Sequence, residues 1–299
     1  MAKDIIQDDI LQIRALLRQV LNTDQFSDLQ RMGGLTNHTY KVTMEDGSEY
    51  VVRIPGEGTE EMIVRSDEMV STKLACDLGV DAQLLYFGDN GAKVTRYIPN
   101  AVTMSADTLR QSRHIRQVAQ IFKTMHSCGV DTGVPFEVFD MARSYEKIIE
   151  EKRVPMFADY EHCKNEVMTI KAEIDAALEI RKVPCHNDPL CENWVEGDGR
   201  MYLIDWEYAG MNDGMWDLAD VSIEACFDSA CDQILLREYM GKDPDVTELK
   251  HFLASKIYVD YLWTLWAKAR VPYDGQPMED WAVERYSRMK NFIREYRAI

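Results

Sequence analysis

A polar segment in the second half of the chain carries residue types used in phosphoryl transfer. In the run His-Asn-Asp-Pro-Leu-Cys-Glu-Asn, Asp188 and Asn193 are five positions apart, and Asp205 follows at the end of a hydrophobic, strand-like stretch. Transfer of a γ-phosphoryl group needs a carboxylate that orients the attacking hydroxyl and accepts its proton. It also needs oxygen ligands for the magnesium on the nucleotide phosphates. We therefore predict that Asp188 is the catalytic residue and that Asn193 and Asp205 bind the metal.

The order of these residues resembles the catalytic segment of protein kinases, where an aspartate, an asparagine five positions later and a strand-end aspartate follow one another. Here Asp-Trp-Glu at 205–207 stands in place of the Asp-Phe-Gly triplet. Alone, the Asp-x-x-x-x-Asn motif is equally consistent with a loop whose side chains cap the local backbone. A zinc site at His186 with Cys185 or Cys191 is a weaker alternative, because three or four ligands at recognised spacings are not present.

The first hundred residues predict a small sheet with one inserted helix. Residues 4–21 keep helical periodicity, and 29–56 contain about three strand-like stretches, two of them joined by an Asp-Gly turn. A helix is expected over 60–78, followed by two more strands within 82–100 around a Gly-containing turn. We therefore expect a five-stranded antiparallel sheet.

The remaining chain is predicted to be mostly helical. Between the helices, 183–210 reads as a loop and two strands around a Gly-Asp-Gly turn. This organisation suggests an α+β protein with two lobes, a smaller one at 1–97 and a larger, mostly helical one at 98–299, joined by a hinge at about 97–100. Helical periodicity covers about 107–127, 141–152, 157–181, 215–240, 247–270 and 277–297.

Composition narrows the function classes. Of 299 residues, 46% are hydrophobic, while 34 basic against 51 acidic residues give a formal charge of −17. The negative electrostatic field of such a protein opposes binding to nucleic acid or to an anionic membrane surface. No apolar run approaches the roughly 18 residues of a membrane span, and the first residues lack the pattern of a signal peptide. We expect a cytoplasmic protein with a small-molecule substrate; the apolar pattern predicts no oligomeric state.

The motifs around the catalytic segment are specific enough to suggest a family. His-Asn-Asp-x-x-x-x-Asn, Ile-Asp-Trp-Glu-Tyr-Ala-Gly-x-Asn and Trp-Asp-Leu-Ala, all within 185–224, resemble the choline/ethanolamine kinase family of the aminoglycoside phosphotransferase-like group. The resemblance extends from the Gly-Gly-x-Thr-Asn turn through Val-Val-Arg-Ile-Pro-Gly to the aromatic C-terminal helices, and it is strongest to bacterial choline kinases. It implies a bilobal, protein-kinase-like fold and phosphoryl transfer from ATP with Mg²⁺.

In the first lobe, the resemblance implies nucleotide binding by the Gly-Gly-Leu-Thr-Asn turn, a strand arginine and the hinge. Arg53 stands where protein kinases use lysine, and a guanidinium can pair with both a phosphate and a helix carboxylate. Glu68 is the expected partner, with Glu60 and Glu61 as alternatives. The Gly-Gly pair alone is very weak evidence for phosphate binding, because an ordinary hairpin turn also accounts for it. The residues expected to bind the nucleotide are Gly33, Gly34, Thr36, Asn37, Arg53, Glu68, Tyr97 and Ile98.

The acceptor site is expected among the C-terminal aromatic residues. A quaternary ammonium donates no hydrogen bond, so a site holds it with aromatic faces and an acidic side chain. The resemblance assigns this role to Trp263, Trp266 and Glu224, and to Trp281 at a position where the family commonly has tyrosine. Without the family, Trp-x-x-Trp on a helix is more typical of core packing, and Glu224 of a solvated acidic face. The residues expected to support the site without touching substrate are His186, Glu207 and Asp217.

The sequence therefore favours an ATP- and Mg²⁺-dependent kinase that makes phosphocholine from choline. Within the same class, the alternatives are phosphorylation of ethanolamine, thiamine or an aminoglycoside, and they depend on the acceptor pocket. From a different class, a kinase-like protein that binds a quaternary amine without turnover is the alternative. The presence of Asp188, Asn193 and Asp205 together argues against it.

Overall fold

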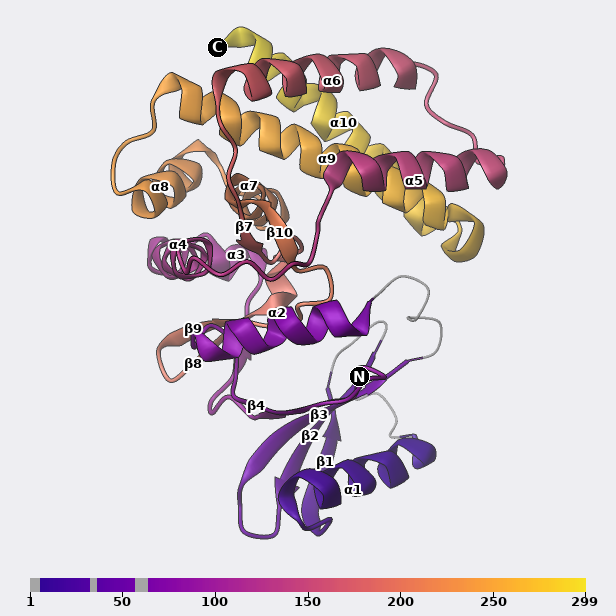
Figure 1. Ribbon diagram of the computed structural model, residues 1–299, viewed down its shortest axis with the longest axis vertical. Helices are drawn as coiled ribbons and strands as arrows, with labels where there is room; N and C mark the ends of the chain where they lie inside the picture. Colours follow the sequence, from indigo (N-terminus) through magenta and orange to yellow (C-terminus); the bar gives the residue numbers. More distant parts are fainter. Residues whose placement is uncertain (1–5, 33–36, 57–63) are drawn as a thin grey trace. The chain divides into compact units, whose positions relative to one another are not determined.

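The computed structural model describes residues 6–32, 37–56 and 64–299 (Figure 1). Internal contacts divide the chain into two compact units. The first comprises Met1–Met104 with Glu192–Ala209, and the second comprises Ser105–Cys191 with Gly210–Ile299. The segment with Asn193 and Asp205 therefore packs with the N-terminal residues. A single boundary at 97–100, as the sequence suggests, would instead assign this segment to the C-terminal lobe.

The first unit is built on the five-stranded antiparallel sheet that the sequence predicts. Its strand order is β1-β2-β3-β5-β4. The Asp-Gly turn joins β2 to β3, where Gly47 adopts φ 82°, a backbone conformation that glycine adopts without steric cost. The strands are β1 (Phe26–Arg31), β2 (Asn37–Met44), β3 (Glu49–Pro55), β4 (Leu84–Phe87) and β5 (Lys93–Arg96).

The described part of this unit also contains two α-helices and a second, smaller sheet. Helix α1 (Gln7–Leu21) lies along one face of the sheet and buries Ile13 and Leu17 against Tyr40 and Val52 (Figure 1). Helix α2 (Arg65–Asp77) connects β3 to β4. The smaller sheet pairs β8 (Trp194–Gly197) with β9 (Arg200–Leu203), the two strands predicted around the Gly-Asp-Gly turn, and adds β6 (Val102–Thr103), which the sequence does not predict.

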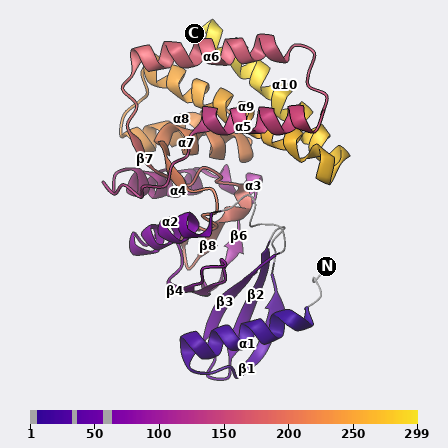
Figure 2. The same ribbon diagram turned by 45° about the vertical axis from the view of Figure 1, so that its right-hand side comes forward.

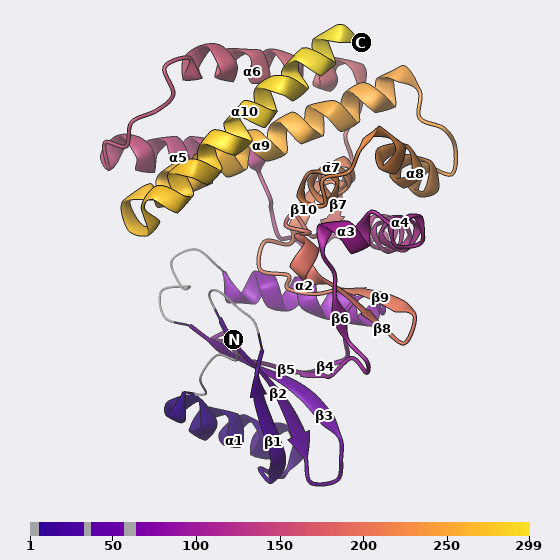
Figure 3. The ribbon, with the colours of Figure 1, turned by 180° about the vertical axis from the view of Figure 1, so that it is seen from behind.

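The second unit is predominantly helical, as predicted. Helices α5, α6 and α10 pack against α9 (Figures 2 and 3), and α9 forms a hairpin with α10 that turns at Gly275. Its elements are α3 (Ala106–Leu109), α4 (Ser112–His126), α5 (Val138–Glu151), α6 (Tyr160–Ala177), β7 (Lys182–Cys185), β10 (Gly210–Asp213), α7 (Gly214–Glu224), α8 (Ser229–Met240), α9 (Val246–Asp274) and α10 (Gln276–Ala298). Within the described residues, no helix combines the length and apolar character needed to cross a bilayer.

Three predictions about helices and strands are wrong in detail. The helix expected over 215–240 is two helices, because Cys226 adopts φ 52° and the Asp228 side chain caps the start of α8 by accepting the Cys231 N–H. The helix expected over 107–127 likewise divides into α3 and α4. The paired strands β7 and β10 were missed because each has four residues and a partner distant in sequence.

Candidate active site

Two arginines and two glutamates form a buried charged cluster in the first unit. The guanidinium of Arg53, in β3, lies 2.6 Å from Oε1 of Glu68 on α2, whose side chain is completely buried. Arg65, one turn earlier on α2, donates to Oε2 of Glu68 at 2.6 Å and to Oε1 of Glu207 at 2.8 Å. Arg53 also approaches Glu207, at 3.4 Å. The structure therefore pairs Arg53 with Glu68; Glu60 and Glu61 lie outside the described residues.

Carboxylate oxygens in excess of cations gather beside this cluster. Oδ1 of Asp205 is 3.6 Å from Arg53 and is buried without a hydrogen-bond partner among the described residues, although 44% of the Asp205 side chain is exposed. Carboxylate oxygens of Glu68, Asp205 and Glu207 all lie within 4.8 Å of one another. Counted over the residues that the structure describes, three carboxylates face two guanidiniums, an excess of one negative charge. Magnesium prefers oxygen ligands of this kind, so the donor set fits a divalent cation at Asp205 and Glu207.

The segment that carries Asn193 and Asp205 is held by backbone and side-chain hydrogen bonds. The Ile204 N–H donates to the Asn193 carbonyl at 2.9 Å, so the two predicted metal ligands lie at adjacent ends of the β8–β9 hairpin. Trp206 is completely buried, and its Nε1 donates to Oδ2 of Asp81 at 3.0 Å. Burial raises the pKa of Asp81 to about 6. The tryptophan that replaces phenylalanine in the kinase triplet thus adds a polar link to the α2–β4 connection.

The other residues expected to bind the nucleotide divide into three groups. Gly33, Gly34 and Thr36 lie outside the described residues. Asn37 opens β2 and donates from Nδ2 to Oε1 of Glu207 at 2.8 Å, so it joins the charged cluster. Tyr97 donates its backbone N–H to Glu49 at 3.1 Å, and Ile98 packs with Ala82 and Val195 in a small apolar core.

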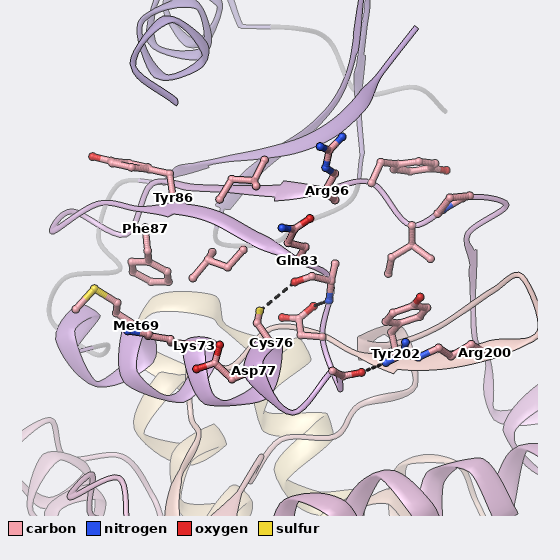
Figure 4. A pocket seen from close by; sticks show the side chains of 18 residues that line it. Met69, Lys73, Cys76, Asp77, Gln83, Tyr86, Phe87, Arg96, Arg200 and Tyr202 are labelled. Atoms are coloured by element: carbon pink, nitrogen blue, oxygen red, sulfur yellow. Dashed lines mark hydrogen bonds between the residues drawn. The ribbon is translucent and has the colours of Figure 1, made fainter. Parts of the chain in front are cut away.

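A pocket of about 840 Å³ lies within the first unit, between α2 and β4 (Figure 4). Met69, Lys73 and Cys76 line it from one face of α2, and Tyr97 and Ile98 contribute to another wall. Residues one helical turn apart share a face, and Glu68 points from a different face toward Arg53. The pocket is therefore separate from the charged cluster, none of whose members lines it.

The segment of the second unit that is predicted to be catalytic is anchored by Asp217 on α7. Its two carboxylate oxygens accept the backbone N–H groups of His186 and Asn187, each at 2.8 Å. Nε2 of His126 contacts the same carboxylate at 3.1 Å, while Nδ1 of His126 lies 2.9 Å from the Tyr239 hydroxyl. Asp217 is 1% exposed, so this network is shielded from solvent. It fixes the backbone immediately before Asp188.

Asp188 follows this anchored backbone with a half-buried side chain. Its N–H donates to Nδ1 of His186 at 3.3 Å, which makes that ring nitrogen an acceptor. Asn187 adopts φ 67° and accepts the indole N–H of Trp216 on its carbonyl at 3.0 Å, which sharpens the turn that presents Asp188. Burial raises the pKa of the Cys185 thiol well above its usual range, which disfavours its thiolate form.

The three predicted acceptor-site tryptophans form a continuous aromatic array. Trp263 and Trp266 lie on α9 with ring centroids 6.2 Å apart, and Trp281 on α10 is 5.8 Å from Trp266; both pairs meet nearly edge to face. Trp263 is 5% exposed, whereas Trp266 and Trp281 are half-buried. The structure thus brings together residues that are up to 18 positions apart in the sequence.

Arg285 contacts two of the side chains that are predicted to bind the cation of the substrate, Trp281 and Glu224. The Arg285 guanidinium carbon lies 4.1 Å from the ring centroid of Trp281, and its Nη2 donates to Oε1 of Glu224. Nη1 also donates to Asp260 at 3.1 Å. Arg285 is 2% exposed. Glu224 is therefore already paired with a cation from within the protein.

Sequence reasoning missed Arg65 and Arg285, although each leaves a local signal. Arg65 precedes Glu68 by three positions and Arg285 follows Trp281 by four, so each shares a helix face with a residue already predicted to be functional. Their contacts with Glu207 and Glu224 join residues 142 and 61 positions apart. These long-range contacts are visible only in the fold.

Comparison with known proteins gives one consistent result. The choline/ethanolamine kinase family model matches residues 29–296. A crystal structure of a choline/ethanolamine kinase family protein from Mesorhizobium loti is 31% identical, with a TM-score of 0.84, and covers 96% of this chain and 95% of its own. Choline kinase LicA from Streptococcus pneumoniae is 30% identical, with a TM-score of 0.81 and coverages of 97% and 100%. LicA has also been solved in complex with AMP, at 29% identity and a TM-score of 0.76 over 96% of this chain and 98% of its own.

More distant structures share the fold alone. Spectinomycin phosphotransferase, solved with ADP and spectinomycin, is 12% identical with a TM-score of 0.65 over 97% of this chain and 98% of its own. The expected kinase-like α+β fold is thereby confirmed. The chain belongs to the choline/ethanolamine kinase family, and it is a phosphotransferase that acts on the alcohol group of a small amino alcohol.

Proposed function

We propose that this protein transfers the γ-phosphoryl group of ATP to the hydroxyl of choline, with Mg²⁺, to give phosphocholine and ADP. The observation that carries the proposal is the array of Trp263, Trp266 and Trp281, because aromatic faces suit a quaternary ammonium that donates no hydrogen bond. LicA, a relative with about the same length, is a choline kinase. The functional division into lobes at 1–97 and 98–299, with a hinge at about 97–100, is part of this proposal.

Asp188 is the proposed catalytic carboxylate. Asp217 fixes the two peptide N–H groups before it, so the Asp188 carboxylate can orient the choline hydroxyl and accept its proton as the oxygen attacks phosphorus. His186 and Asp217 act through the backbone and do not need to touch substrate.

Arg53 is the proposed ligand of the nucleotide phosphates. The ion pair with Glu68 keeps the Arg53 guanidinium ordered. Arg65 forms ion pairs with both Glu68 and Glu207 and so balances part of their negative charge. Gly33, Gly34, Thr36 and Asn37 complete the proposed phosphate contacts, and Tyr97 and Ile98 are proposed to contact the base.

Asn193 and Asp205 are the proposed Mg²⁺ ligands, and the position of Glu207 adds a third candidate oxygen donor. When bound, the ion neutralises charge on the nucleotide phosphates. The buried Oδ1 of Asp205, which has no hydrogen-bond partner in the described chain, supports this assignment.

Ethanolamine is the second candidate acceptor, because the carboxyl groups near the aromatic array can accept hydrogen bonds from a primary ammonium. An acceptor panel separates the candidates. Purified protein is incubated with MgATP and choline, ethanolamine, thiamine or an aminoglycoside, and ADP release is measured. Turnover that is fastest with choline supports the proposal. Faster turnover with another acceptor retains phosphoryl transfer and rejects choline as the substrate.

A further inference from the structure

A second carboxyl group lies beside the proposed acceptor site. Asp220 is on α7, one turn before Glu224 and one turn after Asp217. It is 1% exposed, and neither of its carboxyl oxygens has a hydrogen-bond partner within the described chain. A buried carboxyl without partners is costly, so native proteins rarely keep one without a ligand or a functional need.

Unlike Asp220, the carboxylates of Glu224 and Asp260 have cationic partners. Glu224 is paired with Arg285, and Asp260 is paired with both Arg285 and Arg288. Arg285 is therefore shared between two carboxylates, and it also stacks on Trp281. Asp220 has no cation in ion-pair distance within the described residues. Of these three carboxyl groups, Asp220 alone lacks a counter-ion in the described part of the chain.

Asp220 shares a face of α7 with Glu224, which follows it by one turn. The charges of Glu224 and Asp188 are among those that act on its carboxyl group. Two carbon atoms separate the hydroxyl and the nitrogen of choline, so these atoms are about 4 Å apart at most. A counter-ion for the nitrogen must therefore lie near Asp188.

We propose that Asp220, rather than Glu224, is the counter-ion for the cationic group of the acceptor. This inference rests on the proposed function, and it assigns Glu224 to holding Arg285 against Trp281. Substrate binding would then provide the positive charge that Asp220 lacks. Acceptors without a positive charge would be selected against because they leave the buried carboxyl unpaired.

The electrostatic environment of Asp220 adds a pH dependence. Burial, and next the charges of Glu224 and Asp188, raise its pKa well above the usual range; Arg285 opposes this, and Asp217 adds to it. A cation favours the ionised carboxyl, so binding at low pH must first remove a proton. Affinity for a cationic acceptor should therefore rise with pH through the pKa of Asp220, whereas affinity for a neutral analogue should not.

The test compares choline with 3,3-dimethylbutan-1-ol, its uncharged carbon isostere. KM and kcat are measured for both alcohols with the wild type, Asp220→Asn and Glu224→Gln. We expect Asp220→Asn to reduce the preference for choline, expressed as the ratio of the two KM values, by about thirtyfold or more. We expect kcat to fall less than KM rises and the KM for MgATP to be unchanged. In Glu224→Gln the preference should persist. An unchanged preference in Asp220→Asn, or its loss in Glu224→Gln alone, overturns the inference.

Two further measurements keep the inference testable. If Asp220→Asn does not fold, the pH dependence of the choline preference is measured in the wild type, and a preference that stays constant with pH overturns the inference. If the wild type phosphorylates ethanolamine and not choline, the proposed substrate is wrong. The same comparison is then made between ethanolamine and propan-1-ol, where retention of the charge preference in Asp220→Asn again overturns the role of Asp220.

Discussion

Replacement of Asp217 by asparagine is a direct test of how the fold positions Asp188, the proposed catalytic residue. The carboxylate of Asp217 accepts the N–H groups of His186 and Asn187 at 2.8 Å each, on separate oxygens. An asparagine side chain has one acceptor oxygen and one amide group, so it can accept only one of these bonds. Its amide would face the other N–H, and two donors would then oppose each other in a site that is 1% exposed.

The magnitude follows from the bonds that are lost. A hydrogen bond to a charged group contributes about 1.5–3 kcal/mol, and a buried donor left without a partner costs about 1–3 kcal/mol. We therefore expect Asp217→Asn to lower the free energy of unfolding by about 3 kcal/mol. Displacement of the loop by about 1 Å should also lower kcat by about 100-fold. The KM for MgATP should change little, because the proposed phosphate ligands lie in other segments.

The assay combines urea unfolding with steady-state ADP release, and Asp213→Asn is the matched control. Asp213 caps the same helix by accepting the Met215 N–H at 2.9 Å, and asparagine caps helices equally well. The control should retain kcat. If Asp217→Asn keeps the wild-type kcat while losing stability, Asp217 does not position the catalytic loop and the reasoning is refuted.

Three other substitutions test separate parts of the mechanism and the fold. Arg53→Lys should raise the KM for MgATP about tenfold and leave the KM for choline unchanged, because lysine offers one compact charge in place of a guanidinium fork. If steady-state kinetics show an unchanged KM for MgATP, Arg53 does not bind the nucleotide phosphates. Trp263→Leu keeps apolar bulk but removes the π face, so the choline KM should rise about thirtyfold while the MgATP KM stays constant; equal effects on both would indicate a structural role only. Asp81 has its pKa raised from 3.8 to about 6 by burial. Between about pH 4 and 6 the unfolded state therefore loses its proton first, and stability should fall by about 3 kcal/mol as pH rises. Urea unfolding of Asp81→Asn should lack this fall, and a parallel pH dependence in both proteins would contradict the assignment.

Local patterns predict those parts of the fold that depend on neighbouring residues. The five strands, the β2–β3 turn and the β8–β9 hairpin follow from alternation and Gly-containing turns, and the structure contains them. The division of 215–240 into two helices could not be predicted from periodicity, because both halves keep helical spacing. It depends on Cys226 in a left-handed conformation and on the Asp228 cap.

For the candidate site, too, the sequence predicts the local motifs but not the contacts between distant segments. The spacing of Asp188, Asn193 and Asp205 is a property of the sequence, so the sequence alone predicts a phosphoryl-transfer role for these residues. The pairing of Arg285 with Glu224 depends on the α9–α10 hairpin returning to the end of α7, a tertiary arrangement that no local pattern encodes. The resemblance therefore assigns the acceptor cation to Glu224, whereas we propose Asp220 in its place because Glu224 is already paired with Arg285.

The central claim is that Asp188 catalyses phosphoryl transfer to choline. The most direct measurement follows phosphocholine formation from MgATP and choline by phosphorus NMR, in the wild type and in Asp188→Ala, with choline binding measured in parallel by tryptophan fluorescence. We expect phosphocholine from the wild type, and a variant that binds choline but forms the product about a thousandfold more slowly. Phosphocholine formation at the wild-type rate in Asp188→Ala would contradict the claim.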